Sequence, residues 1–160
     1  MIIIGFPCIG KSSVANKPIS GYSFSGFIDL ESSNFVKNDN WESEYCNVAL
    51  DLSNQGYNVF VSSHESVREY LSKFQDNYNI IEVFPSFTMY DEWIRRLENR
   101  YRLDPSDKNK RAYDYVSNSF FAAIANMMND DIELKLILDY NSHINDLSRE
   151  IGEFCSKFGL

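Results

Sequence analysis

The segment from Gly5 to Ser12 has residue types and spacing that suit phosphate chemistry. It matches the full pattern G-x-x-x-x-G-K-[ST] and directly follows the apolar run Met1-Ile2-Ile3-Ile4. Glycines let a backbone curl around phosphate oxygens, so several N–H groups and the N-terminus of the following helix point inward. In such a loop Lys11 neutralises the β- and γ-phosphates, and the Ser12 hydroxyl takes a magnesium position. We therefore predict binding of ATP and Mg²⁺ by Gly5, Pro7, Cys8, Ile9, Gly10, Lys11, Ser12 and Ser13.

Two carboxylates follow the next apolar run, Gly26-Phe27-Ile28. Asp29 and Glu31 are two positions apart, so their side chains point the same way on an extended chain. Phosphoryl transfer mainly needs positioning and charge neutralisation, so Asp29 is our candidate to hold a magnesium-bound water or to orient the acceptor. Glu31 is expected to contact the acceptor. The alternative is that these residues cap a following helix. The run from Asn58 to His64 ends without a carboxylate, which leaves more of the metal binding to Asp29.

Positive charge is concentrated in residues 95–111, which carry seven Lys and Arg against three Asp and Glu, a net +4 in a chain of net −8. Arg96 and Arg100 are four residues apart and share a helix face. Such a face can clamp phosphates and stabilise the charge that develops during transfer. The alternative is a solvated face of Arg–Glu pairs. We expect a small helical lid over about residues 90–112, with a hinge at residues 103–107.

Three more residues are candidates for binding the acceptor. His64 and Arg68 follow the run Asn58–Ser62, at the carboxyl end of an expected strand, where ligands of parallel sheets bind. Capping of the next helix by Ser63 is the alternative for this turn. Arg95 belongs to the basic segment.

Short apolar runs alternate with helical patterns along the chain, which predicts an α/β fold with a parallel sheet between two layers of helices. A first helix of only one or two turns is expected after Ser12, because Pro18 and Gly21 follow closely. We expect one domain over residues 1–160, a three-layer P-loop fold. Its five expected strands cover residues 1–5, 26–30, 58–62, 79–84 and 132–138, and its longer helices cover 41–55, 65–74, 91–101, 108–128 and 143–158.

Composition narrows the class of protein. A net charge of −8 and a pI near 4.7 disfavour sequence-independent binding to nucleic acid, which relies on excess Lys and Arg. The three cysteines are widely spaced and odd in number, which favours a reducing compartment over a disulfide framework or a zinc site. No run approaches the roughly 20 apolar residues of a membrane span, so we expect no membrane partner and a cytoplasmic location.

Four blocks of this sequence, residues 5–13, 27–33, 59–68 and 92–101, together resemble the nucleoside-monophosphate-kinase-like branch of P-loop kinases. That branch includes adenylate, shikimate and gluconate kinases, and small phage and bacterial members look particularly similar. The resemblance implies a five-stranded parallel sheet with a small lid, and transfer of the γ-phosphate of ATP to a small acceptor. It puts Asp29 in the acidic position after the second strand, and Arg96 and Arg100 among the lid arginines.

The sequence departs from adenylate kinases in two ways. Cys8 replaces a glycine, and the Asp-Gly-x-Pro-Arg segment that binds the monophosphate is absent. The leading hypothesis is a kinase of a nucleoside monophosphate, a deoxynucleotide in the host cytoplasm if a phage encodes the chain. One alternative is a kinase of a modified base such as 5-hydroxymethyluracil within DNA, which the acidic balance disfavours. Another is an ATP-binding module that regulates without transfer.

Overall fold

The computed structural model describes residues 1–15 and 26–160. The described residues form one sheet of five parallel strands in the order β2-β3-β1-β4-β5. The α/β class and the five-stranded parallel sheet are therefore confirmed. The expected effect of Pro18 and Gly21 on the first helix concerns residues outside the described ranges. The strands are β1 (Ile2–Gly5), β2 (Phe27–Asp29), β3 (Asn58–Ser62), β4 (Ile80–Pro85) and β5 (Leu134–Leu138).

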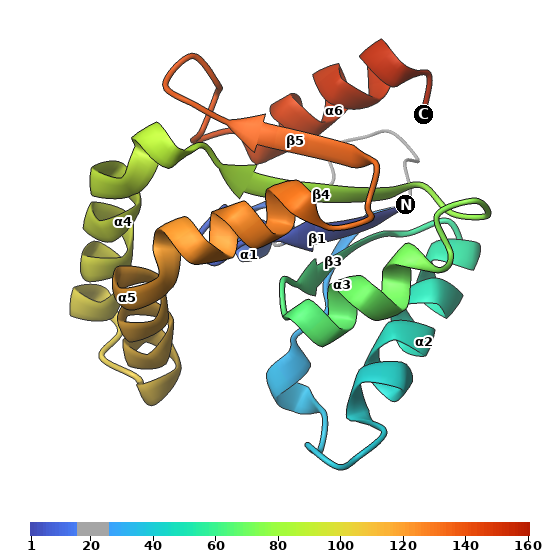
Figure 1. The fold of residues 1–160 in the computed structure, drawn as a ribbon, viewed down its shortest axis with the longest axis horizontal. Helices are drawn as coiled ribbons and strands as arrows, with labels where there is room; N and C mark the ends of the chain where they lie inside the picture. The colour runs from blue at the N-terminus through green and yellow to red at the C-terminus, as the bar shows by residue number, and fades with distance from the viewer. Residues whose placement is uncertain (16–25) are drawn as a thin grey trace.

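Helices cover the sheet on both sides, as three layers require. Helices α2 and α3 pack together, with α2 also against β3 and β1, and α5 packs on β4, whereas α1 and α6 contact each other. In Figure 1, α4 and α5 lie side by side as an arm at one end of the sheet. The helices are α1 (Lys11–Ala15), α2 (Trp41–Asn54), α3 (Glu65–Ser72), α4 (Tyr90–Leu103), α5 (Asp107–Asn129) and α6 (Leu147–Phe158), with short 3-10 turns η1 (Ser32–Asn34) and η2 (Phe87–Met89).

The strand β1 lies at the centre of the sheet, between β3 and β4. Its residues Ile2, Ile3 and Ile4 are fully buried, because a central parallel strand is covered on both faces. This burial explains why the strand reads as a continuous apolar run. Its last residue, Gly5, is in register with Ser62 of β3, so both strands deliver their carboxyl ends to the same edge.

The last expected helix begins later than the sequence pattern indicated, at Leu147 instead of residue 143. Asp139 accepts hydrogen bonds from the backbone N–H groups of Asn141 and Ser142 at 2.7 and 3.2 Å. An aspartate that bonds the backbone in this way favours a turn over a helix. The turn after β5 therefore extends toward the pocket described below. The last strand is also shorter than expected and begins at Leu134.

A cluster of charged side chains is buried beside the sheet. Glu82, in the middle of β4, is fully buried, and its carboxylate lies 3.3 Å from Arg68 Nε and 3.5 Å from Lys135 Nζ. The same two cations contact Asp130 more closely, at 2.7 Å each. We call Arg68, Glu82, Asp130 and Lys135 the buried ion cluster. It joins α3, β4, β5 and the end of α5.

Among the described residues, no helix is both long enough and apolar enough to cross a membrane.

Candidate nucleotide site

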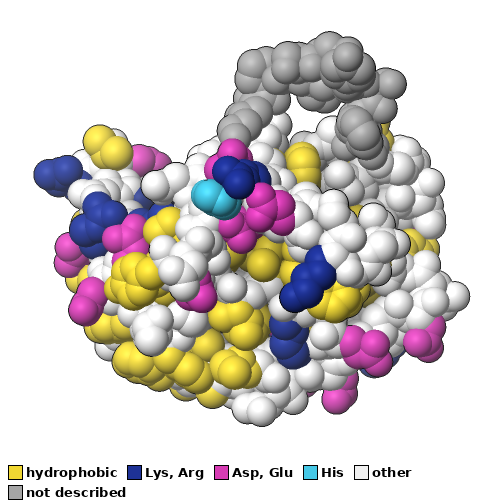
Figure 2. All heavy atoms as spheres, turned by 90° about the horizontal axis from the view of Figure 1, so that it is seen from above, with side chains coloured by type: hydrophobic (Ala, Val, Ile, Leu, Met, Phe, Trp, Pro, Cys, Tyr) yellow, Lys and Arg dark blue, Asp and Glu magenta, His cyan; other side chains and the backbone are white. Residues whose placement is uncertain are grey.

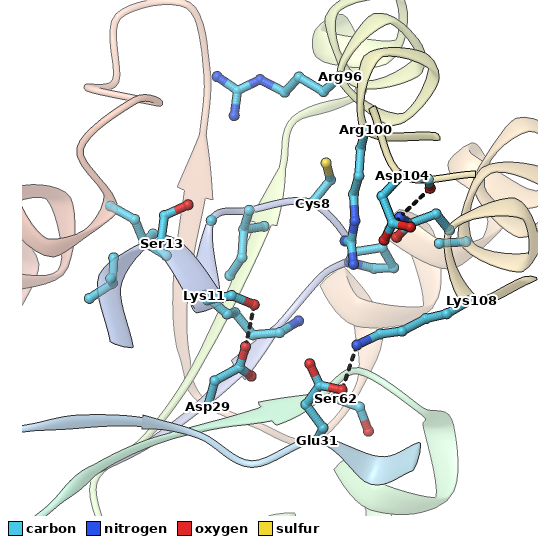
Figure 3. A pocket seen from close by; sticks show the side chains of 18 of the residues that line it. Cys8, Lys11, Ser13, Asp29, Glu31, Ser62, Arg96, Arg100, Asp104 and Lys108 are labelled. Atoms are coloured by element: carbon cyan, nitrogen blue, oxygen red, sulfur yellow. Dashed lines mark hydrogen bonds and ion pairs between the residues drawn. The ribbon is translucent and has the colours of Figure 1, made fainter. Parts of the chain in front are cut away.

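A pocket of about 840 Å³ lies at the carboxyl edge of the sheet. Its walls come from the loop after β1, from the end of β2, from the arm of α4 and α5, and from the turn before α6. Figure 3 shows labelled side chains from the loop, the β2 end and the arm around one space. This is the edge at which ligands of open parallel sheets bind. Of the residues expected to contact a nucleotide, the lining includes Pro7, Cys8, Ile9, Gly10, Lys11, Ser12 and Ser13.

The loop between β1 and α1 has a backbone that depends on its glycines. A Cβ atom on Gly5 would lie 2.6 Å from Ile9 Cδ1 and 2.8 Å from Lys11 Cδ, closer than real Cβ contacts. Gly10 has a φ of +103°, which L residues rarely adopt. Cys8, where adenylate kinases have glycine, has a φ of 68°, which is uncommon for a residue with a Cβ atom. The loop therefore keeps a tightly curled shape.

Lys11 is partly buried and folds back onto the loop it follows. Its Nζ donates a hydrogen bond to the carbonyl oxygen of Gly5 at 2.7 Å. Burial lowers the pKa of Lys11 to about 8, although the nearby Asp29 carboxylate acts in the opposite direction. The ammonium group therefore has a carbonyl partner but little compensation for its lost hydration. A phosphate beside Lys11 would supply that compensation.

Ser12 and Asp29, the two residues expected at the magnesium ion, are in contact. The Ser12 hydroxyl donates to Asp29 Oδ2 at 2.6 Å, and Figure 3 shows Asp29 turned toward the start of α1. The Ser62 hydroxyl, also in the lining, is buried and has no hydrogen-bond partner among the described residues. The Ser12 hydroxyl and the Asp29 carboxylate are hard oxygen donors, which suit Mg²⁺ and its bound waters. In this arrangement Ser12 and Asp29 would hold the ion.

Arg100 projects from α4 toward the loop. In Figure 3 its side chain descends beside Cys8 and Lys11. Burial raises the pKa of the Cys8 thiol, and the guanidinium groups of Arg100 and Arg96 partly oppose this effect. Arg100 therefore adds positive charge on the side of the pocket opposite Asp29. The expected lid arginine is in the pocket.

Arg96 also lines the pocket, but its guanidinium group already has partners. Its Nε contacts Glu92 at 2.8 Å, and its other nitrogens donate to Ile144 O at 3.2 and 3.3 Å and to Asn145 Oδ1 at 2.9 Å. Arg96 thus ties α4 to the turn before α6. Arg96 therefore lines the pocket and is also paired with a glutamate, as the alternative of Arg–Glu pairs described.

Arg95 lies at the rim of the pocket. Its side chain is 62% exposed and forms hydrogen bonds of 2.7 to 2.9 Å with both carboxylate oxygens of Glu92. An exposed pair of this kind contributes little to stability and can exchange partners. Arg95 is therefore at the edge of the site and not inside it.

Two expected acceptor residues lie outside the pocket lining. Arg68 is only 6% exposed, and its guanidinium group belongs to the buried ion cluster. The prediction that Arg68 binds the acceptor is corrected accordingly, because its guanidinium group pairs with Asp130 and lies beside Glu82 in the interior. His64 precedes α3 and packs edge-on against Trp41, with ring centroids 5.7 Å apart. Burial lowers the pKa of His64, which favours a neutral ring.

Sequence reasoning missed a contact that crosses the pocket. Lys108, in the first turn of α5, reaches Glu31 with an Nζ to Oε2 distance of 2.5 Å (Figure 3). The hydrogen bond from Lys108 lowers the pKa of Glu31, although burial opposes it. The basic segment marks Lys108 as a candidate for the site. Its partner Glu31 is 77 residues away, so the sequence pattern could not pair the two residues. The contact joins the arm to the end of β2.

Trp93 fixes the other end of the arm. This fully buried residue of α4 donates a hydrogen bond from its indole nitrogen to Pro7 O at 2.8 Å. Helix α4 is therefore attached directly to the loop after β1, whereas α5 reaches across to β2. The expected hinge at residues 103–107 lies between them, since α4 ends at Leu103 and α5 begins at Asp107.

A separate group of titratable side chains lies on the surface. His143, Glu150 and Glu153 offer ligand atoms within 4.8 Å of one another, outside the pocket lining. Figure 2 shows acidic and basic side chains gathered around a histidine on one face of the molecule. Glu153 is paired with Arg149 at 2.7 Å, and Glu150 accepts a hydrogen bond from the backbone N–H of His143. These pairs are enough to account for the group.

Comparison with protein-family models and with curated proteins found no match to this chain.

Proposed function

We propose that the chain is an ATP- and magnesium-dependent phosphotransferase that acts on a small acceptor, most simply a (deoxy)nucleoside monophosphate. The observation that carries this proposal is the convergence of Lys11, the Ser12–Asp29 pair and Arg100 on one pocket at the carboxyl edge of a parallel sheet. Phosphoryl transfer needs cations around the transferred group and a positioned acceptor, and these residues supply both. The resemblance to nucleoside-monophosphate-kinase-like enzymes supports the same reaction, and the three free cysteines suit a reducing cytoplasm.

The residues divide the reaction between them. The curled loop and Lys11 hold the β- and γ-phosphates, and Arg100 compensates the charge that develops on the transferred group. Magnesium, held by Ser12 and Asp29, would neutralise phosphate oxygens. An oxygen of the acceptor attacks the γ-phosphorus, the bond to the β-phosphate oxygen breaks, and ADP leaves. Asp29 also lies where it can orient the attacking group, since β2 ends beside the loop.

Replacement of Asp29 by asparagine tests this proposal. Asp29→Asn should reduce phosphoryl transfer by about 100-fold, because a small misplacement of the metal or the attacking group costs about that factor. Affinity for ATP should stay within a few-fold, since the loop and Lys11 remain. A coupled assay of ADP formation with a panel of deoxynucleoside monophosphates gives the rate, and fluorescence titration with labelled ATP gives the affinity. The exposed Asp39 supplies a matched control, Asp39→Asn.

Two results would contradict the proposal. If the unmodified chain binds ATP but forms no ADP with any nucleotide acceptor, a regulatory ATP-binding module replaces the nucleotide kinase as the better description. If DNA containing a hydroxymethylated base accepts phosphate while mononucleotides do not, the acceptor is a polymer. The Asp29→Asn variant should still lose transfer in that second case.

A further inference from the structure

The second half of helix α5 is uncharged although part of it lies at the surface. Residues 115–129 contain no Asp, Glu, Lys, Arg or His, in a chain in which 24% of the residues are charged. Phe121 and Met128 belong to this stretch and are exposed, and residues seven positions apart share a helix face. One face of α5 therefore presents apolar side chains to solvent.

Phe121 extends this surface across neighbouring elements. Its ring stacks on Tyr90 at the start of α4, with ring centroids 5.2 Å apart, and on Phe87 in η2, with centroids 6.2 Å apart. Tyr140, in the turn after β5, reaches the same place, because its hydroxyl donates to Thr88 O of η2 at 3.3 Å. Phe87 and Tyr140 are both exposed. The apolar surface therefore continues from α5 over η2 to the turn after β5.

The edge strand β5 completes this surface. Lys135 of β5 donates hydrogen bonds to Asp130 at the end of α5, so its side of the strand faces α5. Ile137 lies two residues further along β5 and points to the same side, where it is exposed. Figure 2 shows hydrophobic side chains gathered at the lower left, on the side of the molecule where α5 lies in Figure 1. The residues that we call the apolar face are Phe87, Tyr90, Phe121, Met128, Ile137 and Tyr140.

The apolar face has the area that a dimer interface needs. Five of its six side chains are between 41% and 65% exposed, which leaves roughly 400–500 Å² of apolar surface in contact with water. The largest apolar patch on a typical monomer covers about 300–600 Å² and is often functional. A standard interface buries about 800 Å² on each partner, and about 56–65% of that area is apolar. The apolar face therefore provides about as much apolar surface as one side of a stable interface.

The neutrality of this surface indicates that the partner is a second copy of the chain. A two-fold symmetric contact uses the same patch on both copies, so a side chain near the axis meets its own copy. A charge at that place would meet the same charge and weaken the contact, whereas a partner of different sequence can match a charge with its opposite. Aromatic rings, by contrast, pack well against their own kind. An uncharged stretch over residues 115–129 is therefore a requirement of self-association and not of binding to another protein.

We infer that the chain forms a two-fold symmetric dimer through the apolar face, with Phe121 near the axis and the α5 helices of the two copies packed against each other. This inference goes beyond the proposed function and does not depend on it. The apolar face shares no residue with the lining of the pocket, so the contact and the pocket are separate. Both copies carry a net charge of −8, so their charges outside the contact repel one another.

Sedimentation equilibrium of the full chain over a range of protein concentrations tests this inference. We expect a monomer–dimer equilibrium with a Kd of about 1 µM or lower, the range of interfaces of standard size. Salt screens the repulsion between two copies of net charge −8, so raising the ionic strength from about 0.02 M to about 0.3 M should strengthen the dimer. A chain that stays monomeric at about 100 µM would overturn the inference.

Charge variants at Phe121 locate the contact. Phe121→Asp and Phe121→Lys each place like charges near the axis, so each should raise the Kd at least about 30-fold, as the loss of a central aromatic anchor does. An equimolar mixture of the two variants should recover the dimer, because opposite charges then meet across the axis. Val36→Asp, at a position that is 79% exposed and outside the apolar face, should dimerise as the unmodified chain does.

The monomeric variants should keep the circular dichroism spectrum of the unmodified chain, because Phe121 is exposed and its replacement leaves the core intact. Dimers that persist in both Phe121 variants would place the contact on another face and overturn the inference. A mixture of the two variants that stays monomeric would do the same, since Phe121 would then not face its own copy.

Discussion

Lys11 is a residue whose charge depends on what occupies the pocket. Its pKa of about 8 results from burial and lies well below the ordinary 10.5 of lysine. A bound phosphate would stabilise the protonated form and raise that pKa again. At a pH between the pKa of Lys11 in the free chain and its higher pKa in the complex, Lys11 is neutral when free and protonated when nucleotide is bound. Nucleotide binding in this range must therefore take up a proton.

This linkage predicts that affinity for ATP declines as pH rises above about 8. The limit is a ten-fold loss for each pH unit while the complex keeps the proton, with little change below pH 7 from this group. Calorimetry of ATP binding in buffers of different ionisation enthalpy measures the proton uptake directly.

The free energy of unfolding of the unliganded chain should increase between pH 8 and 10.5. In this range folded Lys11 has lost its proton, whereas the lysine of the unfolded chain stays protonated up to its ordinary pKa. In Lys11→Arg the pH dependence should disappear, since guanidinium does not titrate there. A wild-type affinity that is constant from pH 7 to 10 would contradict this account.

The arm of α4 and α5 is attached to the rest of the molecule by two contacts of different kinds. Trp93 binds the loop after β1 from a fully buried position, whereas the Lys108–Glu31 pair is partly exposed, with 48% and 35% of the two side chains accessible. Exposed ion pairs contribute about 0–1 kcal/mol and exchange readily with water. We therefore expect the α5 end of the arm to open more easily than the end held by Trp93.

Lys108→Met should loosen this end of the arm without unfolding the protein. We expect faster amide hydrogen exchange in the first turns of α5 and more ATP hydrolysis relative to transfer, because an open arm admits water. The melting temperature should change little. Lys110→Met is the matched control, since Lys110 pairs with Asp114 within the same helix at 2.9 Å and does not line the pocket. Unchanged exchange in Lys108→Met would show that the arm is held without this pair.

At the scale of the whole molecule, the buried ion cluster links helices on one face to strands of the sheet. Burial, together with the hydrogen bond to Asp130, raises the pKa of Glu82 to about 9. At Asp130 burial acts to raise the pKa of the carboxyl. The hydrogen bonds from Glu82, Lys135 and Arg68 outweigh burial, so the pKa of Asp130 is lowered. The two cations are nearer to Asp130, so Asp130 carries the negative charge and Glu82 stays protonated.

The consequence is a stability that depends on pH. Between the ordinary pKa of 4.5 and about 9, folded Glu82 holds a proton that the unfolded chain has released. The free energy of unfolding should therefore decrease as pH rises through this range. Glu82→Gln, which keeps the shape and the donor without the ionisation, should flatten the dependence and be more stable than wild type near pH 9. Urea denaturation at several pH values measures this, with the exposed Glu133→Gln as control. A Glu82→Gln curve parallel to wild type would contradict the proposed protonation.

Much of the fold could be predicted because its signals are local. The apolar runs, the glycines of the loop after β1 and Pro105 at the hinge each act through their immediate neighbours, and the strands and helices follow from them. The contact of Ser12 with Asp29 follows from topology, since β2 ends at the same edge as β1. Arg68 was misassigned because its partners come from distant segments. Glu82 within the apolar run Ile80–Phe84 was the available signal, since a carboxylate buried in a strand needs a cation.

The thiol of Cys8 makes the pocket accessible to chemistry that the natural reaction does not use. Cys8 lines the pocket, whereas Cys46 is fully buried and Cys155, in α6, contacts Met1. A bound nucleotide would shield Cys8 from a maleimide, so the rate of alkylation reports how much of the pocket is occupied. The raised pKa of Cys8 makes this labelling slow at neutral pH and faster in mild alkali. Electrophiles carried on a nucleotide-like scaffold would attach at this cysteine, where a glycine in adenylate kinases offers no such group.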